Sequence, residues 1–214
     1  MVEAITYSSE EIYEILKNRI IQLDYEPGQI LNEKDIASEF NVSRTPIRKV
    51  FEQLKNNKLL NIIPRYGAQV APIDFLYMKS VFEVVRELNG FAANLAAKKI
   101  TPEKIEELEA ILEKIKNYDI EKDYTEIIIQ DQNFHKIIFE SAANPCLIDI
   151  LYGLQMHTER MWIYAKPEIG EINLFLNTMP DIVKALKSGN SEQASNYAKN
   201  HTDIFVERIK QEFF

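Results

Sequence analysis

Two groups of polar residues in this 214-residue chain have types and spacings that could carry chemistry. The first begins with Asp131 and His135, which are four residues apart and therefore project from one face of a helix. That face is otherwise apolar, and His201 stands in a similar apolar stretch near the end of the chain. Two imidazoles and a carboxylate that converge in a helical bundle are suitable ligands for zinc or a similar divalent ion. The alternative is that Asp131 and His135 only hydrogen-bond to each other and to a neighbouring tyrosine, because buried polar groups need partners.

The second group is Ser43, Arg44, Thr45 and Arg48, at the start of a helix that the pattern predicts after a three-residue break. Side chains at this place can reach base edges in the major groove of DNA, and Arg is the commonest specific reader of guanine. The surrounding segment, residues 41–67, contains six basic residues and one acidic residue. Such a basic patch either binds phosphates or is only a solvated charge cluster.

Composition limits the classes of protein to consider. With 46% hydrophobic and 27% charged residues, six Gly and eight Pro, the chain is typical of a helix-rich globular protein. No stretch is apolar enough for a membrane span and the acidic start is not a signal peptide, so we expect a cytoplasmic protein without a membrane partner. The single cysteine, Cys146, excludes an intramolecular disulfide framework and a cysteine-based zinc site. The net charge of −8 is unevenly divided, with −1 in residues 1–72 and −7 in residues 73–214.

Residues 1–72 predict a winged helix-turn-helix domain: a helix, a short helix, a tight turn, a third helix and a hairpin. The expected elements are Ser8–Leu23, Glu33–Phe40, Arg44–Asn57, Leu59–Ile63 and Ala68–Ala71. Ser43 is the expected N-cap of the third helix. The hairpin turns at Pro64–Gly67, with Gly at its tip, and Arg65 and Tyr66 on this wing are expected to touch the minor groove or the phosphates.

Residues 73–214 predict an all-helical bundle, which makes the expected fold class mainly α. The six helical patterns are Asp74–Lys98, Pro102–Tyr118, Lys122–Ala143, Pro145–Lys166, Glu171–Ser188 and Ser191–Phe213. A domain of this size can bury a core of its own.

The run PGQILNEKDIASEFNVSRTPIRKVFEQLKNNKLLNIIPRYGAQV resembles the DNA-binding domain of the GntR family of bacterial transcriptional regulators. The resemblance covers residues 8–72 and implies that five residues take DNA-contact positions: Lys34, Arg44, Thr45, Arg48 and Gly67. The family usually has Arg where this chain has Lys34, which we therefore expect to act as a point charge toward phosphate.

The phrases RELNGFAANLAAKKIT, DQNFHKIIFESAANPCL and SEQASNYAKNH resemble the FCD effector domain of the FadR subfamily, in its six-helix, VanR-like form. This resemblance implies a metal such as Zn, Ni or Mn, for which Asp131, His135 and His201 match three of four family ligands. The remaining histidine is replaced at its expected position by Met179, and a thioether is a poor ligand for these ions. The expected site is therefore one ligand short.

The first helix of the bundle departs from the family in the residues expected to bind an effector. Val85 and Asn89 stand where the family usually has Arg and Glu, and Arg86 is one position away. A buried Arg could clamp an effector carboxylate through two hydrogen bonds, so Arg86 and Arg160 are the candidates for effector binding. Equally, Arg86 could lie on the outer face or form an ion pair between helices.

The function that these features favour is a ligand-responsive transcriptional regulator, not an enzyme. A homodimer would bind double-stranded operator DNA, and a small molecule in the bundle, expected to be an organic acid, would change its DNA affinity. Two alternatives stay open at this point. One is a metal-dependent, hydrolase-like helical domain, and the other is a regulator that binds no ligand and only dimerises.

Overall fold

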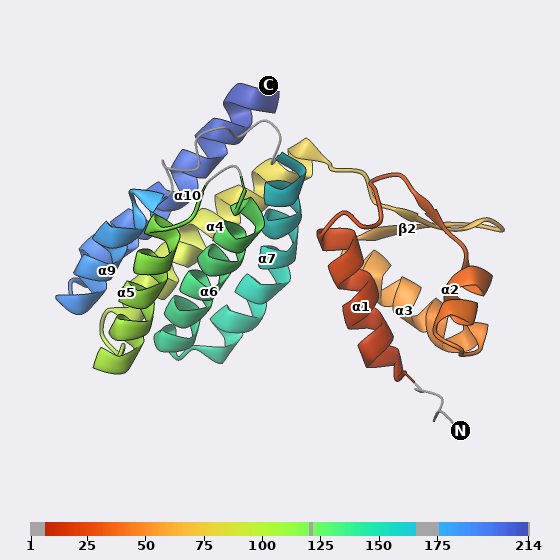
Figure 1. Cartoon of the computed structure of the whole chain (residues 1–214), viewed down its shortest axis with the longest axis horizontal. Helices are drawn as coiled ribbons and strands as arrows, with labels where there is room; N and C mark the ends of the chain where they lie inside the picture. Colours follow the sequence, from red (N-terminus) through yellow and green to blue (C-terminus); the bar gives the residue numbers. More distant parts are fainter. Residues whose placement is uncertain (1–6, 120–121, 166–175, 214) are drawn as a thin grey trace. The chain divides into compact units, whose positions relative to one another are not determined.

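The computed structural model describes residues 7–119, 122–165 and 176–213. The chain divides into two compact units, Met1–Asp74 and Phe75–Phe214, and Figure 1 labels most of their helices and strands. The division falls two residues after the boundary expected at residue 72.

The N-terminal unit contains the predicted elements and one additional strand. Its elements are α1 (Ser9–Ile21), β1 (Ile30–Leu31), α2 (Glu33–Glu39), α3 (Arg44–Asn56), β2 (Leu60–Ile63) and β3 (Gly67–Val70). The Ser8 hydroxyl accepts the backbone N–H of Glu11, whose carboxylate accepts the backbone N–H of Ser8, so α1 starts with a capping box. Asn32 caps α2 in a similar way. Ser43 precedes α3 as expected, but its side chain makes no capping hydrogen bond.

The core of this unit lies between α1 and α3. Leu16 and Ile20 of α1 and Ile47, Val50 and Leu54 of α3 are all completely buried. Burial of each such side chain contributes roughly 1.5–3 kcal/mol. This packing leaves the start of α3 at the surface.

The three strands form an antiparallel sheet in the order β1-β3-β2, and β3 pairs with both neighbours. The turn of the β2–β3 hairpin lies at Pro64–Tyr66, so Gly67 is the first residue of β3 and not the tip of the turn as predicted. Gly67 has a φ of +120°, and a Cβ atom there would lie 2.5 Å from the carbonyl oxygen of Leu31. Only glycine allows β1 to approach β3 this closely.

Six helices occupy the described part of the C-terminal unit, in the order predicted. They are α4 (Phe75–Ala96), α5 (Pro102–Lys116), α6 (Tyr124–Ala142), α7 (Pro145–Ala165), α9 (Met179–Lys187) and α10 (Ser191–Phe213). Thr101 caps α5 by accepting the backbone N–H of Lys104, and Pro102 follows at the first helical position. Within the fifth predicted helix, Glu171–Ser188, the structure describes α9 from Met179 to Lys187; the predicted residues 166 and 171–175 lie outside the described residues.

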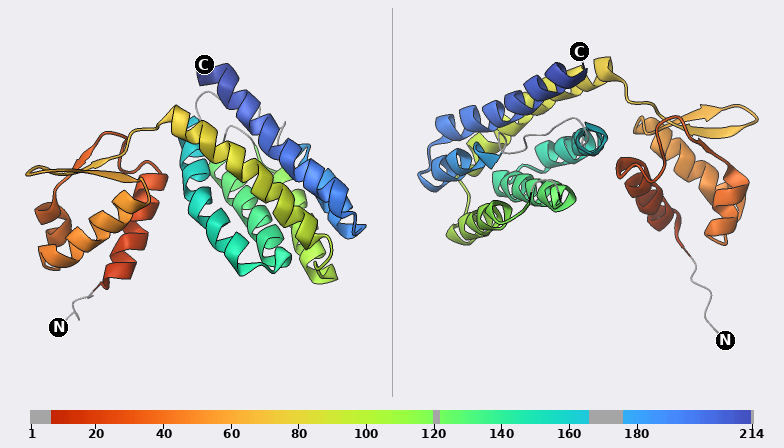
Figure 2. Two further views of the ribbon diagram at one scale, coloured as in Figure 1. Left: turned by 180° about the vertical axis from the view of Figure 1, so that it is seen from behind. Right: turned by 45° about the horizontal axis from the view of Figure 1, so that its top comes forward.

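The two longest helices, α4 and α10, run antiparallel and side by side (Figure 2). Near one end the Asn94 amide donates to the backbone carbonyl of Ser191 at 3.1 Å, and near the middle Arg86 Nε donates to Asp203 at 2.7 Å. A third contact occurs at Gly90, which has no side chain to obstruct Lys199 of α10. Among the described residues, no helix is long and apolar enough to cross a membrane.

Candidate nucleic-acid interface and bundle cavity

The start of α3 presents polar side chains to solvent. Ser43, Arg44, Thr45 and Arg48 are all exposed, because the apolar side of α3 faces α1. The N-terminus of a helix also carries a partial positive charge, which favours contact with phosphate. This end of α3 therefore has the accessibility and charge needed to enter a groove of DNA.

The carboxylate of Glu33 forms ion pairs with both arginines of this surface, and sequence analysis did not predict these pairs. Oε2 of Glu33, the first residue of α2, lies 3.2 Å from Arg44 Nη2 and 2.8 Å from Arg48 Nε. Glu33 is the less accessible partner, with 21% of its side chain exposed against 59% and 62% for the arginines. The contact sets the direction of both guanidinium groups in the absence of DNA.

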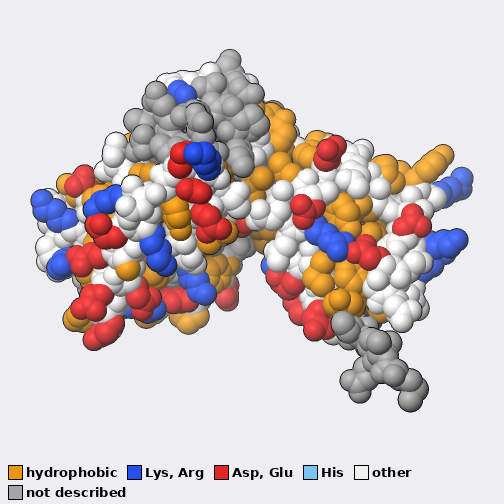
Figure 3. Space-filling model, viewed as in Figure 1, with side chains coloured by type: hydrophobic (Ala, Val, Ile, Leu, Met, Phe, Trp, Pro, Cys, Tyr) orange, Lys and Arg blue, Asp and Glu red, His pale blue; other side chains and the backbone are white. Residues whose placement is uncertain are grey.

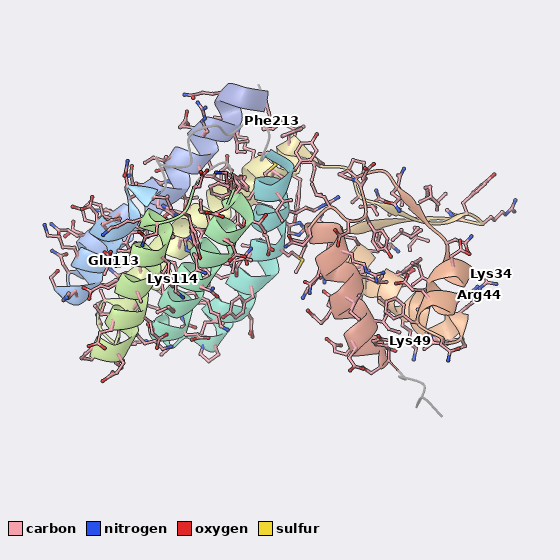
Figure 4. The ribbon with its side chains drawn as sticks, viewed as in Figure 1. Lys34, Arg44, Lys49, Glu113, Lys114 and Phe213 are labelled. Carbon is pink, nitrogen blue, oxygen red and sulfur yellow. The ribbon has the colours of Figure 1, made fainter. Side chains whose placement is uncertain are left out.

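The remaining predicted contact residues lie near this surface or on the wing. Lys34 follows Glu33 on α2, and Figure 4 shows it beside Arg44 at one edge of the N-terminal unit. Lys and Arg side chains gather along the same edge in the space-filling view (Figure 3). Arg65 and Tyr66 are exposed in the β2–β3 turn, where a second contact with DNA could form. Gly67 shapes the wing through its backbone and offers no side chain.

A cavity lies among α4, α6, α7 and α10 of the C-terminal unit. Its apolar walls are formed by Phe82, Val85, Ile128, Phe139, Leu151, Trp162 and Phe205. Its polar lining consists of Asn89, Asp131, Gln132, His135, Gln155, Thr158, Glu159, His201 and Thr202. Val85 and Asn89, which stand at the family's Arg and Glu positions, thus do face the cavity.

Asp131, His135 and His201 come together in this cavity from α6 and α10. Oδ1 of Asp131 lies 3.6 Å from His135 Nε2 and 3.4 Å from His201 Nε2, and the three ligand atoms all lie within 4.8 Å of one another. Thr178 Oγ1 lies 2.5 Å from Nδ1 of His201, on the other side of the ring. A partner at one ring nitrogen that orients the other toward a common point is the usual arrangement around a bound metal.

Burial and charge prepare these groups for cation binding. Burial favours a raised pKa for Asp131, but the charge of His135 and the hydrogen bond and charge of His201 outweigh it, and the pKa of this carboxyl is lowered. Burial also lowers the pKa of His135, although the Asp131 carboxylate opposes that shift. A metal ion requires an ionised carboxylate and neutral imidazoles, and the direction of each shift favours that form.

Met179 does not complete this ligand set. It is 1% exposed and belongs to the apolar core of the bundle, not to the lining of the cavity. Its neighbour Thr178 is the residue that reaches His201. His157 also stays apart, since it is buried on α7 with its ring edge-on to Tyr77.

Neither arginine expected to clamp an effector is among the described residues that line the cavity. Arg86 pairs with Asp203 and Glu87 on the outer side of the α4–α10 contact. Arg160 is buried on α7, where desolvation lowers its pKa to about 10, but it is absent from the described lining. The neighbouring helix positions Glu159 and Trp162 line the cavity instead, because they lie on another face of α7.

Comparison with known proteins agrees with both units. The profile of bacterial regulatory proteins of the gntR family matches residues 8–70, and the FCD domain profile matches residues 80–203. The HTH-type transcriptional repressor RspR of Escherichia coli (strain K12) is 25% identical over 203 residues, which are 95% of this chain and 89% of that protein. The gluconate operon transcriptional repressor of Bacillus licheniformis is 31% identical over 140 residues, or 65% of this chain and 57% of that protein.

A solved structure shares the whole fold. E. coli McbR/YncC superposes with a TM-score of 0.83 and 21% identity, with 100% of each chain covered. This likeness supports the predicted combination of a winged helix-turn-helix and a helical bundle. The matching families and relatives are transcriptional regulators and not enzymes, which overturns the hydrolase-like alternative.

Proposed function

The chain belongs to the gntR family of bacterial transcriptional regulators and carries an FCD domain, and we propose that it binds operator DNA as a homodimer whose affinity responds to a small molecule in the bundle cavity. Regulation of transcription follows from the family. The operator contacts, the homodimer, the ligand and the metal are the parts that we add, each from a feature of the described residues.

The observation that carries the proposal is the exposed start of α3. Arg44 and Arg48 lie outside the core there, on the helix that occupies the recognition position of a winged helix-turn-helix. We assign base contacts to these arginines and to Ser43 and Thr45. Lys34, Arg65 and Tyr66 are assigned to phosphates or the minor groove. Each bidentate arginine–guanine contact is worth about 1–3 kcal/mol of discrimination.

Fluorescence anisotropy tests the DNA contacts with a duplex that the protein enriches from a random library. We expect Arg44→Ala and Arg48→Ala each to weaken binding of this duplex by about 5- to 150-fold. The control is Lys55→Ala, which lies about 16 Å from Arg44 and about 10 Å from Arg48 along the axis of α3 and should change affinity far less. Equal affinity of the wild-type protein for the enriched and a scrambled duplex would refute sequence-specific regulation.

Exposed apolar side chains on α4 support the homodimer. Leu76, Val84 and Phe91 are 78%, 48% and 47% exposed, and their spacing of about two turns places them on one face. We propose that a second copy covers this face, since a palindromic operator needs two recognition helices. Light scattering after size-exclusion chromatography should show a dimer that the double variant Val84→Glu/Phe91→Glu converts to a monomer. The exposed α5 variant Ala110→Glu should stay dimeric, and a monomeric wild-type protein at micromolar concentration would contradict the proposal.

Asp131, His135 and His201 fit a divalent ion with three protein ligands. The fit rests on their convergence, on the orientation of His201 by Thr178 and on the lowered pKa of His135. When bound, such an ion supplies a fixed positive charge and open coordination positions. Calorimetric titration of EDTA-treated protein with Zn²⁺ or Mn²⁺ should show one site, which Asp131→Asn and His135→Ala each abolish. Undiminished binding by both variants would place the metal elsewhere.

A further inference from the structure

We infer that the bundle cavity, when it holds no metal ion, selects an uncharged polar ligand with a flat apolar body over the organic acid expected from the family resemblance. The inference rests on the proposed role of this cavity as the effector site. It concerns which chemical class of molecule the lining can accept.

The charges around the cavity disfavour an anion. Its described lining includes the carboxyl groups of Asp131 and Glu159, and it includes no Lys or Arg. The two arginines that could have supplied a positive charge, Arg86 and Arg160, are absent from it. In the metal-free cavity a ligand carboxylate would lose its hydration and meet the Asp131 carboxylate, and both effects oppose binding.

Two buried polar atoms on the wall have no hydrogen-bond partner in the described structure: Asn89 Oδ1 and Gln132 Nε2. The orientation of Asn89 follows from its neighbours. The Thr202 hydroxyl donates to the carbonyl of Ala198 and so accepts from Asn89 Nδ2 at 3.2 Å, which directs Asn89 Oδ1 away from Thr202. The wall thus offers one unpaired acceptor atom, Asn89 Oδ1, and one unpaired donor atom, Gln132 Nε2.

Leaving a buried donor or acceptor unpaired costs more than a hydrogen bond gains. A ligand that satisfies both atoms carries an N–H or O–H for Asn89 and a carbonyl oxygen for Gln132. Amides and similar uncharged groups have both functions, whereas a carboxylate has acceptors only.

Aromatic rings suit the apolar part of such a ligand. Trp162 is stacked on Phe205, with ring centroids 3.9 Å apart and planes 11° apart, and Phe82 meets Phe205 edge-on at 5.2 Å. All three rings line the cavity. Because Trp162 is the chain's single tryptophan, its fluorescence reports directly on occupancy.

The test uses matched acids and amides as probes: benzoate against benzamide, and nicotinate against nicotinamide. Each is titrated into EDTA-treated and zinc-loaded protein while Trp162 fluorescence and the melting temperature are recorded. We expect each amide to bind about tenfold or more tightly than its acid to the EDTA-treated protein. Gln132→Met should weaken amide binding by about two- to tenfold, the worth of one hydrogen bond.

Gln130→Met is the matched control. Gln130 is also buried on α6, but it lines the groove toward α5 and not the cavity, so amide affinity should not change. Circular dichroism confirms that both variants are folded. Tighter binding of the acids to the EDTA-treated protein would overturn the inference and leave the effector site in place. Absence of any response to every probe in both states would instead overturn the effector site, and the inference with it.

Discussion

Replacement of Glu33 by glutamine should increase the affinity of the protein for DNA. In the free protein one carboxylate oxygen of Glu33 contacts both Arg44 and Arg48, at 3.2 and 2.8 Å. These guanidinium groups must leave or share that carboxylate before they bind bases or phosphates. Because both are more than half exposed, solvent limits each pair to about 0.2–1 kcal/mol. In Glu33→Gln these two pairs are absent, so DNA binding no longer has to break interactions worth about 0.4–2 kcal/mol in total. The dissociation constant should therefore fall by about two- to thirtyfold.

Anisotropy titrations of Glu33→Gln with the enriched and the scrambled duplex, over a range of salt concentrations, measure this effect. We expect the scrambled duplex to gain at least as much affinity as the enriched one, since the freed charges bind any phosphate. The control is Glu52→Gln, which breaks a comparable exposed pair with Lys55 near the end of α3 and should change DNA affinity less. If Glu33→Gln leaves the affinities for the enriched and the scrambled duplex unchanged, or weakens both, then this carboxylate does not restrain the arginines and the reasoning fails.

Three further changes test other parts of the structure. Gly67→Ala places a Cβ atom on a residue with positive φ, against the backbone of β1. We expect the free energy of unfolding, measured by urea denaturation, to fall by about 1–3 kcal/mol and DNA binding to weaken. An unchanged urea midpoint would contradict the close contact. Ala143 ends α6 with a φ of +46°, so Ala143→Gly should stabilise the protein by about 0.5–1 kcal/mol, whereas Ala110→Gly on the exposed side of α5 should destabilise it by about the same amount. A shift of the same sign in both variants would contradict this backbone argument. Arg86→Ala should leave the Trp162 titration with benzamide unchanged, because Arg86 pairs with Asp203 outside the cavity; a loss of binding would place Arg86 in the site.

Much of the fold was predictable because local signals agreed with tertiary packing. The capping box at Ser8 and the Thr101-Pro102 start of α5 mark helix ends through hydrogen bonds between near neighbours in sequence. The mainly α fold with a winged helix-turn-helix is confirmed by the families and by the likeness to McbR. Strand β1 was missed, because two residues carry no periodicity and its pairing with β3 spans almost forty residues.

The candidate sites were predictable only where one helix carries the relevant residues. The Asp131–His135 spacing shows that both side chains share a face, and His201 does lie beside them. Contacts between different helices have no comparable spacing pattern in the sequence. The contacts of Thr178 with His201 and of Arg86 with Asp203 could not be predicted, because they depend on how α9 and α4 pack against α10.

The position of α4 has a mechanical consequence. Phe82, Val85 and Asn89 of this helix form part of the cavity wall, and its first residue, Phe75, directly follows the last residue of the N-terminal unit. The helix is about 33 Å long, and Phe82 lies about 10 Å from its first residue. We expect the proposed ligand, where it displaces this wall, to tilt α4 as one piece, because the backbone hydrogen bonds of an α-helix oppose bending. The tilt would move Phe75, the residue at which the N-terminal unit is attached.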